Sequence, residues 1–201
     1  GFVETLEDLL LNEAFAEALQ ERITDVICGI ATLALTEVGD LIDGVSFGDD
    51  MGVQNQSYMS DELYKKMVKP HHRRFVDTLH KHTDAKVITH SDGSIRELIP
   101  DFIDIGIDVI NPVQVSATGM EPEQLNHDFG KDLAFWGGID TQHVLPFGTA
   151  EDVVKAVRGR RKDLGKKGGF IQASVHNIQS EVPPENIVAM FETALEDRVY
   201  D

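Results

Sequence analysis

Residues 86–93 combine a short apolar strand pattern with side chains that can do chemistry. The segment reads Lys-Val-Ile-Thr-His-Ser-Asp-Gly, and its β-branched Val87 and Ile88 suit a buried strand. His90 offers a nitrogen ligand or a base, and Asp92 offers a carboxylate. Because alternate residues of an extended segment lie on the same face, both side chains can converge on one ion or one substrate. The sequence also allows a structural role, in which Asp92 caps the next helix and His90 binds a backbone carbonyl.

Polar residues follow every apolar strand pattern in the chain. Strands are predicted near residues 44–47, 86–89, 108–114, 133–139 and 170–174. The residues at their ends are Asp49 and Asp50, His90 and Asp92, Asn111 and Gln114, Asp140, and His176. Such a recurrence at five strand ends indicates one shared site rather than five unrelated loops.

Helical patterns separate these strands. Helices are predicted over residues 2–38 (in two parts, 6–19 and 23–38), 60–79, 95–103, 122–126 and 153–164, and from residue 183 onward. Within the second of these, we expect His71, His72, Arg73 and Arg74 to form a solvated face. Alternating strands and helices predict parallel strands with helices outside.

Two parallel architectures fit this pattern, and the sequence favours a barrel. A doubly wound sheet usually has a glycine-rich phosphate loop after its first strand, and the sequence shows none there. A (β/α)₈ barrel places functional residues at the carboxyl ends of its strands, as found here. We therefore predict an α/β fold, the C-terminal portion of a (β/α)₈ barrel with about five βα units. Residues 1–201 would form a single partial-barrel domain that lacks the N-terminal units.

The composition restricts the classes of partner. The 201 residues carry a formal net charge of −17, which argues against binding to nucleic acid or to an anionic membrane because phosphates would be repelled. No run of about 18 apolar residues predicts a membrane span, and no signal peptide is visible. The single cysteine, Cys28, excludes an internal disulfide and a thiolate cluster. We expect a cytoplasmic protein.

The strand-end residues suit a metal centre. His90, Asp92 and His176 offer two imidazoles and a carboxylate, a three-ligand set that leaves a fourth position open, as in catalytic zinc sites. The carboxylates of Asp49, Asp50 or Asp140 could ligate instead, or could hold a ligating imidazole. A site without metal is also possible, in which carboxylates and amides orient a polar substrate and one histidine moves protons.

The amides of Asn111 and Gln114 are neutral donors and acceptors. They suit the polar edge of a substrate. Their alternative role is to form the turn around Pro112. The sequence leaves both interpretations open.

Several motifs, in their order and spacing, resemble the uroporphyrinogen decarboxylase superfamily, and within it the branch that includes cobamide-dependent methyltransferases. The resemblance runs from about Asp43 to Glu196. It depends on Phe47–Gly52, Met59–Tyr64 with Lys69–His72, His90–Ile95, Asp108–Gln114, Trp136–Asp140, and Val182–Met190 after His176. It implies a distorted (β/α)₈ barrel in a protein well above this length, whose N-terminal third has no counterpart here.

The resemblance also implies roles for individual residues. The methyltransferase branch carries a zinc site written His-x-Cys, with a further cysteine after the last strand. His90 occupies the histidine position, while Asp92 and His176 stand where the two cysteines would be. The decarboxylases need no metal and carry a histidine in the last loop, which His176 also matches, but they do not show the His90-x-Asp92-Gly93 pattern.

The activity implied is methyl transfer between a small methylated substrate or thiol and a corrinoid carried by a partner protein, with zinc activating the substrate. The expected catalytic residues are His90, His176 and Asp50, the metal ligands are His90, Asp92 and His176, and the substrate-binding residues are Asp49, Asn111, Gln114 and Asp140. The alternatives are a metal-free decarboxylase of a tetrapyrrole or related acid, and a non-catalytic barrel subunit. A homo-oligomer is compatible with the sequence, which does not specify an oligomeric state.

Overall fold

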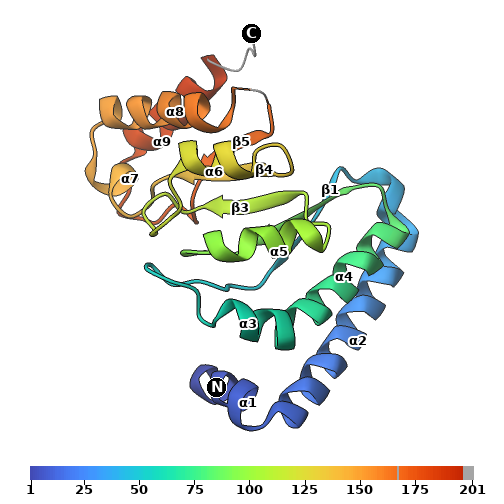
Figure 1. Cartoon of the computed structure of the whole chain (residues 1–201). Helices are drawn as coiled ribbons and strands as arrows, with labels where there is room; N and C mark the ends of the chain where they lie inside the picture. The colour runs from blue at the N-terminus through green and yellow to red at the C-terminus, as the bar shows by residue number, and fades with distance from the viewer. Residues whose placement is uncertain (167, 197–201) are drawn as a thin grey trace. The chain divides into compact units, whose positions relative to one another are not determined.

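The protein contains a five-stranded parallel sheet in which the strands follow one another in chain order (Figure 1). The structure is a computed structural model and describes residues 1–166 and 168–196. The strands are β1 (Gly44–Gly48), β2 (Lys86–His90), β3 (Val109–Val113), β4 (Ala134–Ile139) and β5 (Phe170–Ser174). In a doubly wound sheet, the order in which successive strands are added reverses at a switch point, whereas a barrel adds each strand beside the previous one. The observed order confirms the predicted partial-barrel fold.

The register of the central strands aligns their carboxyl ends. At the carboxyl end of the β3–β4 pair, Val113 lies opposite Gly137, two residues before the end of β4, and in the β4–β5 pair Ile139 lies opposite Ser174. The residues that follow these strands therefore emerge at the same edge of the sheet.

The chain divides into two compact units. One comprises residues 1–46, 59–88 and 97–107, and the other comprises residues 47–58, 89–96 and those from 108 onward. The helices of the first unit are α1 (Phe2–Leu11), α2 (Glu13–Val38), α3 (Asp61–Leu63), the π-helical segment η2 (Tyr64–Val68), α4 (Lys69–His82) and α5 (Ile99–Asp104). Those of the second are α6 (Pro122–Phe129), α7 (Val144–Phe147), α8 (Ala150–Leu164) and α9 (Pro184–Glu196).

The predicted break in the first helical region is wrong in position. The chain breaks at Asn12, whose side-chain amide donates to Asp8, and α2 continues through residues 20–22 without interruption. Those residues are Gln, Glu and Arg, which lack an apolar periodicity but favour helix.

Helices α2 and α4 lie side by side (Figure 1). Arg74 of α4 forms an ion pair with Asp25 of α2, and Cys28 is buried, with the hydroxyl of Thr78 directed at its sulfur. The expectation that His71 lies on a solvated face is wrong, because its side chain is only 10% exposed and faces α2, where Glu17 lies 3.6 Å away.

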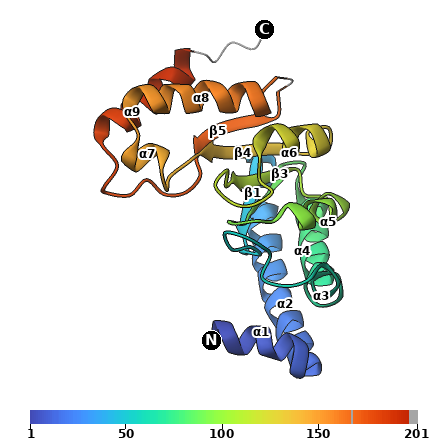
Figure 2. The same cartoon turned by 60° about the vertical axis from the view of Figure 1, so that its left-hand side comes forward.

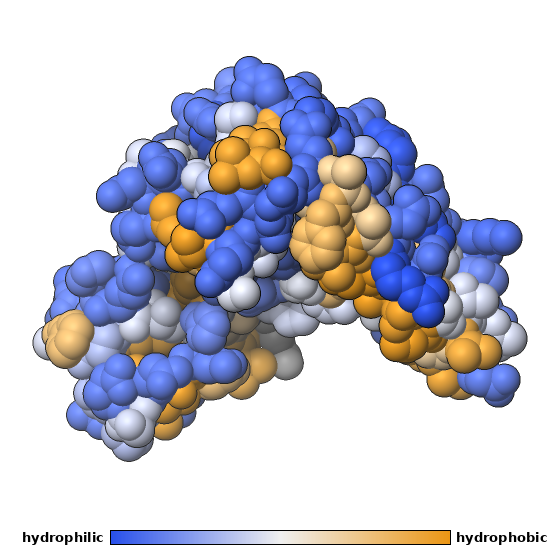
Figure 3. Space-filling model, turned by 90° about the horizontal axis from the view of Figure 1, so that it is seen from below, coloured by the Kyte–Doolittle hydropathy of each residue, from blue (hydrophilic) through white to orange (hydrophobic). Residues whose placement is uncertain are grey.

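Helix α2 carries apolar residues on more than one face. Its buried positions include Ala16 and Leu35, yet large apolar side chains of α1 and α2 are also exposed. They include Phe2, Leu10, Leu11, Phe15, Leu19, Ile23, Ile30 and Leu33, and Figure 3 shows apolar residues at the surface of the molecule. A pattern of this kind is typical of a helix that packs on two sides.

The second unit has its own core between β4 and helices α7, α8 and α9; Figure 2 shows α8 and α9 side by side. The core residues are Ile139, Leu145, Val153, Val157, Val182 and Met190. Helix α8 begins with a capping box, in which Thr149 and Asp152 satisfy each other's backbone N–H groups. This core fixes the end of β4 and the segment after β5.

None of the helices in the described part of the chain is both long enough and apolar enough to traverse a lipid bilayer.

Candidate metal centre

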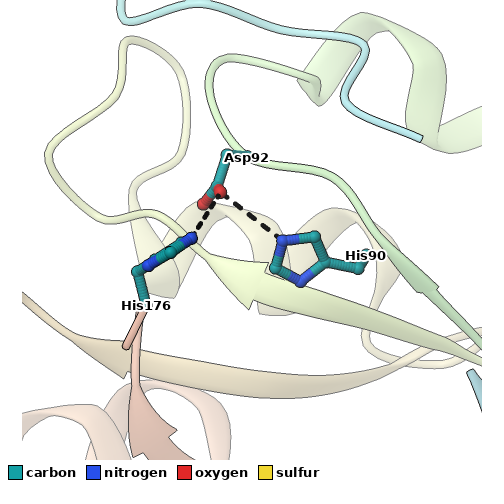
Figure 4. A group of neighbouring side chains, drawn as sticks. All are labelled: His90, Asp92 and His176. Atoms are coloured by element: carbon teal, nitrogen blue, oxygen red, sulfur yellow. Dashed lines mark ion pairs between the residues drawn. The ribbon is translucent and has the colours of Figure 1, made fainter. Parts of the chain in front are cut away.

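Three side chains from the ends of two strands, β2 and β5, converge in the second unit (Figure 4). His90 is the last residue of β2, Asp92 lies two residues beyond it, and His176 lies two residues beyond the end of β5. Oδ2 of Asp92 is 3.5 Å from Nε2 of His90 and 3.8 Å from Nε2 of His176. The structure thus brings together the three residues predicted as ligands.

The geometry of the three groups fits a small divalent cation. One ligand atom from each residue lies within 4.8 Å of the other two. Zinc bonds of about 2.0–2.1 Å in a tetrahedral arrangement place neighbouring ligand atoms roughly 3.4 Å apart. The two carboxylate–imidazole distances are close to this value, so small rotations of the side chains would complete three of four coordination positions.

The loop that carries Asp92 is held by hydrogen bonds to other strand ends. The backbone N–H of Asp92 donates to Oδ1 of Asp50 at 3.0 Å. The N–H of Gly93 donates to Oε1 of the buried Gln114 at 2.7 Å. These contacts fix the backbone on both sides of the Asp92 side chain, leaving its carboxylate directed at the two imidazoles.

Gly93 occupies a position that other residues would enter only with strain. Its φ of +89° lies in the left-handed region. A Cβ atom there would approach the carbonyl carbon of Gly52 to 2.5 Å and the nitrogen of Val53 to 2.8 Å. The loop can therefore take this path only because residue 93 is glycine.

The electrostatics of Asp92 favour a cation. Burial raises the pKa of its carboxyl group above the ordinary value; the imidazole of His90 opposes the rise, the Asp50 carboxylate adds to it, and His176 opposes it. The carboxylate is therefore an anion that its surroundings stabilise incompletely. A positive ion between the three groups would stabilise the carboxylate and offset the rise that burial causes.

The model of the family described as uroporphyrinogen decarboxylase (URO-D) matches residues 1–196. The chain belongs to the uroporphyrinogen decarboxylase family. This confirms the resemblance seen in the strand-end motifs.

A solved structure supports the fold of this uroporphyrinogen decarboxylase family chain. A methyltransferase from Methanosarcina mazei superposes with a TM-score of 0.77 at 15% sequence identity, and the match covers 99% of this chain. The chain spans 54% of the length of that protein. A search of the curated proteins finds no match. At this identity the similarity shows the shared fold.

The other predicted site residues of this family member have identified partners. Oδ1 of Asn111 lies 2.6 Å from Nδ1 of His90. Asp140 accepts hydrogen bonds from the backbone N–H groups of Gln142 and His143, so it shapes the turn after β4. The backbone N–H of Asp49 donates to the carbonyl of His90. Asn111 thus contacts a candidate ligand, whereas Asp50, Gln114 and Asp140 make contacts that order loops.

A cavity of about 370 Å³ adjoins two of the three candidate ligands, Asp92 and His176. It is lined by Asp92, Gln114, Ser116, Asp140, Thr141, Gln142, Val175, His176, Asn177 and Gln179. Four of these are the predicted residues Asp92, Gln114, Asp140 and His176. No motif points to Ser116, Thr141, Gln142 or Gln179, because they lie in loops whose course no periodicity predicts. Asn177 could have been found from its position beside His176.

Proposed function

We propose that this uroporphyrinogen decarboxylase family chain takes part in methyl transfer, with zinc held by His90, Asp92 and His176. The methyl group would move between a small methylated substrate or thiol and a corrinoid on a partner protein. The convergence of the three side chains within 4.8 Å is the observation that carries the proposal. The methyltransferase fold of the Methanosarcina mazei protein supports it at the level of architecture.

The donor set bears on the substrate. Two imidazoles and one carboxylate supply less soft negative charge than thiolates would, so the ion would be a harder and stronger Lewis acid. When bound, zinc would polarise the oxygen that carries the methyl group, for instance the ether oxygen of a methoxy compound. The corrinoid of a partner protein would supply the acceptor of the methyl group, and the substrate oxygen would keep the electron pair of the carbon–oxygen bond.

The residues around the cavity would bind and orient the substrate. Gln114, Gln142, Asn177 and Gln179 present amide groups, and Ser116 and Thr141 present hydroxyls. Such neutral donors and acceptors suit a neutral polar molecule whose methyl-bearing oxygen faces His90 and His176. Asp140 completes the lining on the side of β4.

The decarboxylase alternative is less well supported by this lining. The carboxylates of a tetrapyrrole require cationic partners. Among the described residues that line the cavity, none is Lys or Arg. Arg96, the nearest basic residue in the sequence, pairs with Asp128 and its guanidinium lies over the ring of Phe129, 5.5 Å from the centroid.

The test of the metal centre is elemental analysis of the purified protein. We expect about one equivalent of zinc, and loss of methyl transfer after chelation that zinc restores. As a matched control, His127→Ala removes an exposed histidine of α6 and should leave the zinc content unchanged. A protein without zinc, with methyl transfer unaffected by chelator, would refute the proposed chemistry.

A double variant separates the enzyme from a non-catalytic barrel subunit. Asp92→Ala with His176→Ala should abolish methyl transfer if these groups act in catalysis. Binding of the corrinoid protein, measured by calorimetry, should remain. Methyl transfer at the wild-type rate in the double variant would show that Asp92 and His176 have no catalytic role.

A further inference from the structure

We infer that Asn111 is a positioning residue that selects the tautomer of His90 and so presents Nε2 of its ring as a ligand. The inference rests on the proposed metal centre and assigns to Asn111 a role different from the substrate binding predicted from the sequence. It starts from the shortest polar contact that the structure gives for the His90 ring, the 2.6 Å between Nδ1 and Oδ1 of Asn111.

The two ring nitrogens of His90 face oxygen acceptors at different distances. Nε2 faces the carboxylate of Asp92 at 3.5 Å, which exceeds the usual N–H···O distance of about 2.9 Å. Nδ1 faces the amide oxygen of Asn111 at hydrogen-bonding distance. A neutral imidazole carries one proton, so the two acceptors compete for it.

The outcome of this competition decides whether His90 can bind a metal. A proton on Nε2 would point at Asp92 and occupy the position of the ion. A proton on Nδ1, donated to Asn111, leaves the lone pair of Nε2 directed at Asp92 and His176. Metal-binding histidines generally donate their other ring N–H to an oxygen acceptor in this way.

The position of Asn111 is determined by the sheet. It lies on β3, and its backbone carbonyl accepts the N–H of Ser91, the residue after His90, at 2.8 Å. The same residue therefore binds the chain on the carboxyl side of His90 through its backbone and the ring of His90 through its side chain. These two contacts restrain both the position of the backbone beside His90 and the rotation of its imidazole ring.

Two variants of Asn111 and one control test the inference. Asn111→Leu removes the acceptor at similar volume, and Asn111→Asp replaces the amide by a group that, when ionised, only accepts. Asn55→Leu changes an exposed amide of the same unit that bonds Thr118 rather than a candidate ligand. Tryptophan fluorescence of the single Trp136 shows whether each variant is folded.

The first readout needs no metal. Nitrogen-15 NMR of the imidazoles in metal-free protein, at a pH where they are neutral, reports the protonated nitrogen, and His90 is assigned by its absence in His90→Gln. We expect Nδ1–H in the wild type, in Asn111→Asp and in Asn55→Leu, and Nε2–H in Asn111→Leu. A His90 that keeps Nδ1–H in Asn111→Leu would overturn the inference.

The second readout is the affinity for zinc alone. Loss of the oxygen that accepts a hydrogen bond from the other ring nitrogen of a histidine ligand typically lowers metal affinity about 10–100-fold. We expect a decrease of this size for Asn111→Leu. Asn111→Asp and Asn55→Leu should bind at least as tightly as the wild type. Equal affinity of Asn111→Leu, or weaker binding by Asn111→Asp, would overturn the inference. A wild type that binds no zinc would refute the metal centre, while the NMR measurement would still decide the tautomer.

Discussion

Replacing Gly93 by alanine should damage both the stability of the second unit and the position of Asp92. The residue has a φ of +89°, and an added Cβ would meet backbone atoms of Gly52 and Val53 at 2.5–2.8 Å. Backbone atoms cannot rotate away as a flexible side chain can. The loop must shift, or the contact must be borne as strain.

The magnitude follows from these two contributions. A left-handed conformation costs an L-residue about 1–2 kcal/mol. Overpacking against immovable neighbours adds about 1–3 kcal/mol. Gly93→Ala should therefore lower the free energy of unfolding by roughly 2–5 kcal/mol.

Gly168 supplies a matched control. Its φ is +82°, but among the described residues other than its chain neighbours no heavy atom lies within 4 Å of the position that a Cβ would occupy. Gly168→Ala should cost only the conformational part, about 1–2 kcal/mol. The difference between the variants isolates the steric contact with residues 52 and 53.

The assay is urea unfolding followed by the fluorescence of Trp136, the only tryptophan, which lies on β4 in the same unit. Zinc titration of both variants reports the position of Asp92, and we expect Gly93→Ala to bind more weakly than Gly168→Ala. If the two variants unfold at the same urea concentration and bind zinc equally, the loop does not depend on glycine at residue 93 and the reasoning is wrong.

Three further outcomes concern the helices that support the site. Asn186 is 1% exposed and donates to the carbonyls of Leu145 and Gly148 at 2.8 Å each, so Asn186→Leu should reduce the free energy of unfolding by about 2–4 kcal/mol, measured by urea unfolding. Thr149→Ala removes the N-cap of α8 and should cost about 1 kcal/mol, measured at pH 7 in the same way. The hydroxyl and the backbone N–H of Thr149 donate hydrogen bonds to the Asp152 carboxylate and lower its pKa. The stabilisation from these hydrogen bonds is present above the unfolded pKa of about 3.9, and it disappears as pH falls through the lower folded value. A stability difference between wild type and Thr149→Ala that stays constant down to pH 2 would contradict this linkage.

The fold was predictable because its signals are local. Short apolar runs predicted all five strands, and a helix pattern followed each of them along the chain. The order of strands in the sheet then followed from the absence of a phosphate loop and from the regular repetition. Local signals did not predict the continuity of α2 through residues 20–22, since three consecutive polar residues carry no apolar periodicity.

The convergence of His90 and Asp92 was predicted, but the structure produces it in a different way from the one expected. The expectation treated residues 90 and 92 as alternate positions of one extended segment. In the structure β2 ends at His90, and Asp92 lies in the loop. Its position depends on the hydrogen bonds that residues 92 and 93 make with Asp50 and Gln114. Sequence spacing indicated the right pair, but the bonds that bring the pair together come from other strands.

The partners of Asn111 and Gln114 could not be predicted for the same reason. Which side chain an amide meets depends on the lateral alignment of β3 with the neighbouring strand ends. Neither residue type nor periodicity contains that alignment. The sequence therefore identified two amides, which the structure places within β3 and directly after it, but it could not distinguish an amide that faces a substrate from one that faces an imidazole.

Asp92 and Asp128 of the second unit each lie beside a histidine, and a comparison of the two shows why Asp92 is the one suited to a cation. Hydrogen bonds from His127 and Gln124, with Arg96 nearby, lower the pKa of Asp128 to about 2, because its charge is already satisfied. Asp92 is shifted the opposite way, since it is more deeply buried and its two imidazoles stand 3.5 and 3.8 Å away. Imidazole rings at that distance are too far to donate good hydrogen bonds and are at the spacing of ligands around one ion. The residue type alone does not distinguish the two carboxylates; the spacing of their partners does.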